Sequence, residues 1–156
     1  MIRHVGGGLS ALLLLLTTGP ATATDLVATA EDGTEIARLP APDGTGWCLL
    51  WNHSVQGFPV ADCFENRGGR MVLVSSHQPD FAAGLGHIPE RGRQVSDGAG
   101  GYRILDIDEP VPGGVLTLRP GRATVDHRLR LGETTVSLSD AAPRGRVVIA
   151  LTESEE

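Results

Sequence analysis

Residues of three types that can do chemistry together lie close to one another near the middle of the chain. His53, Ser54 and Asp62 supply a base, a nucleophile and an acid within ten residues. A catalytic triad needs its serine and histidine within hydrogen-bond distance. Neighbouring residues on a strand point to opposite faces, and a serine in a turn commonly bonds to local backbone. No Gly-x-Ser-x-Gly motif is present. We therefore assign no catalytic residue, and an enzyme is the less favoured interpretation.

Histidines offer a second possible chemistry. His53, His77, His87 and His127, together with Asp62, provide enough groups of the right type to hold a metal ion. None of the histidines shows a recognisable metal-binding spacing such as His-x-x-x-His. The sequence therefore predicts neither a metal site nor a bound cofactor.

The two cysteines lie in segments that have the pattern of a β-hairpin. Residues 47–53 and 58–64 flank the turn-like residues 54–57, and a symmetric pairing places Cys48 directly opposite Cys63. A cross-strand pair without hydrogen bonds has its Cα atoms about 4.5 Å apart, which suits a disulfide. An exported chain with an even number of cysteines oxidises them. We therefore expect a Cys48–Cys63 disulfide.

The same pairing sorts the other side chains of the hairpin into two faces. Trp51, His53 and Asp62 share a face with Trp47 and with two of the three phenylalanines, and this face is predicted to form the core or to line a pocket. A buried carboxylate must be paired or hydrogen-bonded, or it keeps its proton. Alternation over residues 123–131 turns His127 inward as well. The plainest interpretation is a polar cluster that joins strands, and a small-ligand or partner site is the alternative.

The elements that position these residues are predicted to be strands. Turn signals rich in glycine and proline recur every 8 to 13 residues along most of the chain, which is typical of a sandwich or barrel. We predict an all-β, single-domain antiparallel β-sandwich or barrel-like fold of about nine or ten short strands. They are expected near residues 26–31, 34–39, 47–53, 58–66, 70–76, 102–107, 114–119, 123–131, 133–138 and 146–151. Between residues 78 and 101 no strand pattern is present, and we expect one long Gly-rich loop there.

The first 23 residues have the layout of a secretory signal peptide. A short basic start precedes 14 mostly apolar residues, and Ala21-Thr22-Ala23 gives the small residues of a cleavage site. We predict a signal peptide at residues 1–23, a β domain at 24–152 and an acidic tail at 153–156. No second apolar run approaches the length of a membrane span, so we expect no span after cleavage and a location in the periplasm.

The net charge of the chain bears on whether nucleic acid could be a partner. The chain carries a net charge of −6, and all 13 of its basic residues are arginine. Binding to nucleic acid requires a basic face, so the composition argues against it.

Several blocks resemble the domain of unknown function 1850 family. They are residues 47–55, 59–64, 81–87, 97–102 and 125–127, and the resemblance spans about residues 46–150. It implies a small exported protein, often encoded beside tripartite (TRAP) transporters of the TAXI type, and it implies no activity. The candidate binding residues within these blocks are Trp51, His53, Asp62, His87, Tyr102 and His127.

Two functions follow as hypotheses. The first is a non-enzymatic accessory or binding module whose partner is a periplasmic solute receptor or a membrane subunit of a TRAP transporter. The alternative is a small-substrate enzyme or a metal-binding protein that uses an inward-facing cluster of Asp62, His53 and His127.

Overall fold

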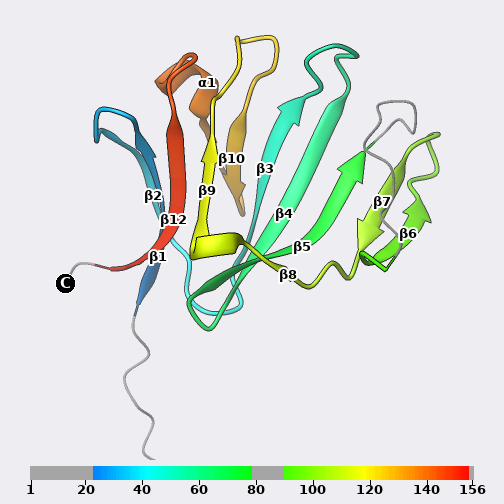
Figure 1. The fold of residues 1–156 in the computed structure, drawn as a ribbon, viewed down its shortest axis with the longest axis horizontal. Helices are drawn as coiled ribbons and strands as arrows, with labels where there is room; N and C mark the ends of the chain where they lie inside the picture. Colours follow the sequence, from blue (N-terminus) through cyan, green and yellow to red (C-terminus); the bar gives the residue numbers. More distant parts are fainter. Residues whose placement is uncertain (1–22, 79–89, 155–156) are drawn as a thin grey trace, which may run out of the picture.

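The computed structural model describes residues 23–78 and 90–154 of the chain. These residues form two antiparallel sheets that pack as a β-sandwich, which confirms the predicted all-β, single-domain fold (Figure 1). The predicted signal peptide and His87 fall on residues outside the described ranges, apart from Ala23. In the described part of the chain, no helix has the length and apolar character that crossing a membrane requires.

The smaller sheet brings the two ends of the domain together. Its strand order is β2-β1-β12-β9, and β1 lies between its hairpin partner β2 and the last strand of the chain. The strands are β1 (Thr24–Ala30), β2 (Glu35–Pro40), β9 (Val115–Leu118) and β12 (Val147–Glu153).

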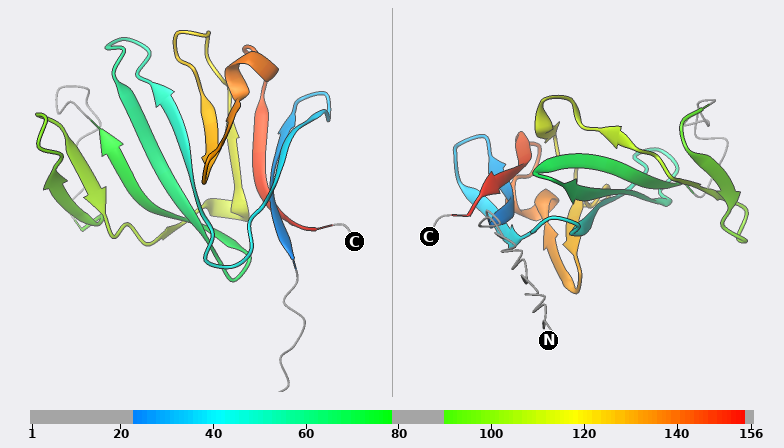
Figure 2. Two further views of the ribbon diagram at one scale, coloured as in Figure 1. Left: turned by 180° about the vertical axis from the view of Figure 1, so that it is seen from behind. Right: turned by 90° about the horizontal axis from the view of Figure 1, so that it is seen from below.

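The larger sheet has eight strands and carries the predicted hairpin at its centre. Its order is β11-β10-β3-β4-β5-β7-β6 (Figure 2). β8 pairs with the part of β5 that does not pair with β7. The strands are β3 (Gly46–Asn52), β4 (Pro59–Arg67), β5 (Arg70–Gln78), β6 (Arg93–Ser96), β7 (Tyr102–Leu105), β8 (Glu109–Pro110), β10 (Arg128–Leu131) and β11 (Thr134–Ser137). A four-residue helix, α1 (Leu138–Ala141), follows β11, and a 3-10 turn at Pro112–Gly114 precedes β9.

The main core lies between the two sheets. Leu26 and Ile149 of the small sheet are fully buried against Trp47, Phe64 and Leu129 of the large sheet. The rings of Trp47 and Phe64 stack with their centroids 6.2 Å apart. We call the face of the large sheet that carries these side chains the inner face, and the opposite face the outer face. Alternation along each strand assigns every other residue to one of the two faces.

The predicted strand at residues 123–131 is too long. β10 begins only at Arg128, because the preceding residues turn: the amide of Val125 donates to the carbonyl of Arg122 over 2.8 Å, and Asp126 has φ of 51°. The apolar alternation of residues 123–127 therefore arises in a turn rather than in a strand.

The predicted long loop contains a strand. β6 pairs with β7 in a hairpin, and residues 98–101 lie in the turn between the two strands. The Asp97 carboxylate accepts hydrogen bonds from the amides of Ala99 and Gly101 over 2.8 and 2.9 Å, which fixes the turn. β6 has only four residues and little apolar alternation, which is why periodicity misses it.

Candidate functional site

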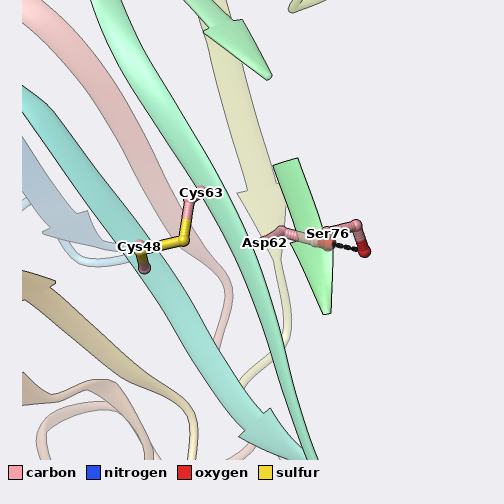
Figure 3. Close-up of a disulfide and its surroundings, with 4 residues drawn as sticks. All are labelled: Cys48, Asp62, Cys63 and Ser76. Carbon is pink, nitrogen blue, oxygen red and sulfur yellow. Dashed lines mark hydrogen bonds between the residues drawn. A yellow bond between two sulfur atoms is a disulfide. The ribbon is translucent and has the colours of Figure 1, made fainter. Parts of the chain in front are cut away.

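Strand β4 places a disulfide on one face of the large sheet and a carboxylate on the other. Cys63 points to the outer face, where it joins Cys48 of β3, and the adjacent Asp62 points to the inner face (Figure 3). Successive side chains of a strand alternate in this way. The side chains of these two adjacent residues therefore lie on opposite faces of the large sheet.

The Cys48–Cys63 disulfide confirms the register that the sequence predicts. The two residues are direct partners in the β3–β4 pairing, and their Cα atoms lie 4.0 Å apart. Both cysteines are half-buried on the outer face. Because β3 and β4 are central strands, the cross-link fixes the middle of the large sheet.

Asp62 takes part in a hydrogen-bonded network of polar side chains on the inner face. The Ser76 hydroxyl donates to its carboxylate over 2.6 Å, and the Gln78 amide nitrogen lies 3.4 Å from the Ser76 oxygen. The hydroxyl of the fully buried Tyr102 in turn donates to the Gln78 amide oxygen over 2.8 Å. The network joins β4, β5 and β7. Two predicted site residues, Asp62 and Tyr102, therefore belong to it.

Burial sets the protonation of this network. Removal from water raises the pKa of Asp62, while the Ser76 hydrogen bond and the positive charge of Arg91 lower it in part. Burial also raises the pKa of Tyr102. The folded environment therefore favours the neutral form of both groups.

His53 lies in the loop after β3, where it organises the hairpin. Its Nδ1 accepts hydrogen bonds from the amides of Gln56 and Val55 over 3.1 and 3.4 Å. Its ring stacks on Phe58 with the centroids 5.0 Å apart. Asp62 pairs with Leu49, four residues earlier on β3, or about 13 Å along the strand. The structure does not bring His53 and Asp62 together.

His127 stacks on Trp51, so these two predicted site residues are in contact. Their ring centroids lie 5.9 Å apart with an interplanar angle of 8°. The Nδ1 of His127 accepts a hydrogen bond from the amide of Gly121 over 3.3 Å. Burial lowers the pKa of His127, and the charge of Asp126 raises it in part. The partners of His127 are thus different from those of Asp62.

The described residues do not assemble a metal centre. No group of three histidines, cysteines or acids within residues 23–78 and 90–154 is arranged to hold an ion. His77 instead pairs with Asp97, with 3.0 Å between Nε2 and Oδ2. This bond, together with the amides of Ala99 and Gly101, lowers the pKa of Asp97.

Sequence reasoning missed Ser76 and Gln78, the residues that bind Asp62 and Tyr102. Their positions depend on the β4–β5 register, which shifts at a bulge between Cys63 and Phe64. A serine and a glutamine at alternate positions of a strand carry no signal that could have identified this network.

A family model described as a domain of unknown function, DUF1850, matches residues 48–138. The chain belongs to this family. The matched span begins at the first cysteine and includes all six candidate binding residues. No curated protein and no solved structure matches the chain. Family membership therefore supports the resemblance and leaves the activity to be argued from the site.

Proposed function

We propose that this DUF1850 domain is an exported accessory module that acts by binding, beside a TRAP transporter of the TAXI type. The observation that carries the exported location is the Cys48–Cys63 disulfide at the centre of the large sheet. Structural disulfides persist in oxidising compartments such as the periplasm and are rare in the cytosol. The signal-like segment at residues 1–23 supports the same location.

A binding role fits the way in which the reactive side chains are used. The Asp62 carboxylate accepts from Ser76, the His53 ring accepts from loop amides, and the His127 ring stacks on Trp51. Each group is engaged in an internal contact with different partners: Asp62 on β4, His53 in the loop after β3 and His127 just before β10. Such contacts stabilise the fold and hold surfaces in place, as a binding module requires.

The loop between β3 and β4 offers a surface for a protein partner. Val55 at its tip is 83% exposed, and the hydrogen bonds to His53 hold the backbone around it. A single exposed valine is common on protein surfaces. Here it sits on an ordered tip, and an apolar side chain held in this way loses little entropy when a partner covers it.

The transporter association rests on the family resemblance and is tested by co-purification. The tagged, exported domain is expressed with the solute receptor and the membrane subunits of the neighbouring transporter. We expect enrichment of one of them over an unrelated periplasmic protein. We also expect Val55→Ser to weaken it, whereas Val115→Ser, at the second large exposed apolar residue (41% exposed), leaves it intact. No enrichment of any subunit would contradict the proposal.

One observation favours the alternative function at Asp62. Catalytic acids often have a pKa that burial has raised. Burial raises the pKa of Asp62 as well. This observation favours a small-substrate enzyme, which would lose activity in Asp62→Asn without losing its fold. A metal-binding protein would lose metal binding in the same variant, and the described residues group no three possible ligands. A zinc titration of the wild-type domain and of this variant separates the metal-binding form of the alternative from the accessory role.

A further inference from the structure

The outer face of the large sheet carries a feature that the proposed function does not use. Arg130 of β10 lies opposite Cys48 on β3, Cys48 lies opposite Cys63 on β4, and Cys63 lies opposite Ser75 on β5. These four residues form one row across four strands. Their side chains share the outer face, because directly paired residues lie on the same side of a sheet.

A second row runs parallel to the first, two residues away along the strands. Ala61 of β4 lies opposite His77 of β5, and His77 lies opposite Arg103 of β7. Ala61 is two residues from Cys63, so both rows share the outer face. The two rows thus place Arg130 at one end and Arg103 at the other, with the short side chains of Ala61, Cys63 and Ser75 between them and the ring of His77 beside Arg103.

This arrangement leaves a hollow of about 240 Å³ on the outer face. Its lining includes the small residues Ala61, Cys63 and Ser75, with Arg130 on one side and Arg103 on the other. The short side chains of Ala61, Cys63 and Ser75 leave space between the two arginines, and the ring of His77 also lines the hollow. The strands of Arg103 and Arg130 are four spacings apart, or about 19 Å between backbones.

Within the described part of the chain, Arg103 and Arg130 lack the acidic partners that several other arginines have. In residues 23–78 and 90–154, no ion pair involves Arg103 or Arg130, and both are exposed. By contrast, Arg128, also on β10, pairs with Asp126 at 3.2 Å. Other arginines are unpaired too, and Arg119 is one of them. Arg103 and Arg130 differ from it because they line the same hollow.

The chemistry of the hollow suits carboxylates. A guanidinium group binds a carboxylate through two parallel hydrogen bonds, and such charge-assisted bonds are among the stronger ones in proteins. The hydroxyl of Ser75 between the arginines adds a donor on the floor. Because the arginines reach in from opposite sides, one ligand engages both only if it has an acidic group at each end.

We propose that this hollow binds a small organic acid with two carboxylates, one held by Arg103 and the other by Arg130. The hollow, of about 240 Å³, has room for a small organic acid of this kind, such as a four-carbon dicarboxylate. The site is separate from the polar network of Asp62 on the inner face and from the loop around Val55. It extends the proposed function and does not depend on the transporter association.

Titration of the disulfide-bonded, isotope-labelled domain by NMR tests the site. Succinate is the probe, and succinamide, which has the same length without charge, is the matched control ligand. We expect saturable shifts at the amides of Ser75, Arg103 and Arg130 with succinate and none with succinamide. Equal binding of the two ligands, or no saturable shift with succinate, would overturn the proposal.

Variants and a second anion locate the binding and define its specificity. Arg103→Gln and Arg130→Gln should each weaken succinate binding about tenfold or more, since each removes one charge-assisted contact. Arg119→Gln is the matched control and should leave affinity unchanged. Thermal melting checks that each variant is folded. Inorganic phosphate that binds as tightly as succinate, or affinity that is equal in all three variants and the wild type, would contradict a dicarboxylate site.

Discussion

The Ser76 hydroxyl on β5 donates a hydrogen bond of 2.6 Å to the Asp62 carboxylate on β4. Ser76 is only 5% exposed, so its hydroxyl relies on this acceptor rather than on water. Burial raises the pKa of Asp62, and the hydrogen bond opposes that change because it stabilises the ionised carboxylate. The balance between burial and the hydrogen bond sets how the stability of the inner face depends on pH.

We predict that Asp62→Asn removes a loss of stability that the wild type undergoes as the pH rises. An acid with a raised pKa binds more protons in the folded state, so the free energy of unfolding falls with pH. The fall begins near the unfolded pKa of about 3.9 and ends above the folded pKa. Urea denaturation should show the variant at least as stable as the wild type at neutral pH, with a smaller difference at strongly acidic pH.

Asp97 provides a control of opposite sign for that experiment. The pKa of Asp97 is lowered by His77 and by the amides of Ala99 and Gly101. Its contribution to stability is therefore present above the unfolded pKa and is lost as the pH falls through the folded pKa. Asp97→Asn should be less stable than the wild type at neutral pH. If Asp62→Asn behaved in the same way, the ionised Asp62 carboxylate would be stabilising.

Removing the disulfide should destabilise the domain without changing its fold. The bridge closes a loop with a sequence separation of 15 residues, for which the chain-entropy estimate is about 3 kcal/mol. We expect the double variant Cys48→Ala with Cys63→Ala to lose about that much free energy of unfolding in urea. A reducing agent should lower the wild type to the same level and leave the variant unchanged. Equal stability with and without the bridge would contradict this.

The burial of His127, whose ring stacks on Trp51, predicts a histidine whose pKa lies below its ordinary value. Burial lowers the pKa of His127, so NMR of the ring protons should give a midpoint below the ordinary value of about 6.5. Since the unfolded chain then binds the proton more readily, stability should fall as the pH drops below that value. His127→Gln should flatten this dependence. A midpoint above the ordinary value would show that the Asp126 charge outweighs burial.

Gly92, just before β6, is predicted to tolerate no side chain. It has φ of +68°, and a Cβ atom there would overlap the carbonyl oxygen of Leu105 and lie 3.0 Å from Ile104 and Ile107 side-chain atoms. Gly92→Ala should therefore cost more than Gly98→Ala, where φ is +79° and the Cβ would meet nothing within 4 Å. The strain alone costs about 1–3 kcal/mol. Urea denaturation compares the two variants, and equal losses would show that the contact with Leu105 relaxes freely.

The local parts of this structure could be predicted from sequence. The hairpin of β3 and β4 is a short-range element with a turn between two alternating runs, so its register and the Cys48–Cys63 pairing followed from symmetry. The positions of Asp62 on the inner face and of Trp47 in the core followed from the same alternation. Period-two patterns report which side chains share a face, and this information is local.

The non-local parts could not be predicted. The Asp62–Ser76 bond depends on a bulge in the β4–β5 pairing, and the hollow between Arg103 and Arg130 depends on β10 lying beside β3. Strand order is decided by the packing of the whole sandwich, and alternation within one strand does not encode it. For the same reason, the sequence suggested that His53, Asp62 and His127 could meet, whereas the structure gives each different partners.

Mass spectrometry of the protein recovered from the periplasm, alkylated before and after reduction, tests most directly whether this is an exported domain with an oxidised centre. The account predicts a chain that begins at Thr24 and has Cys48 and Cys63 unreactive until the disulfide is reduced. A chain that is absent from the periplasm, or one whose two cysteines are alkylated without reduction, would contradict it.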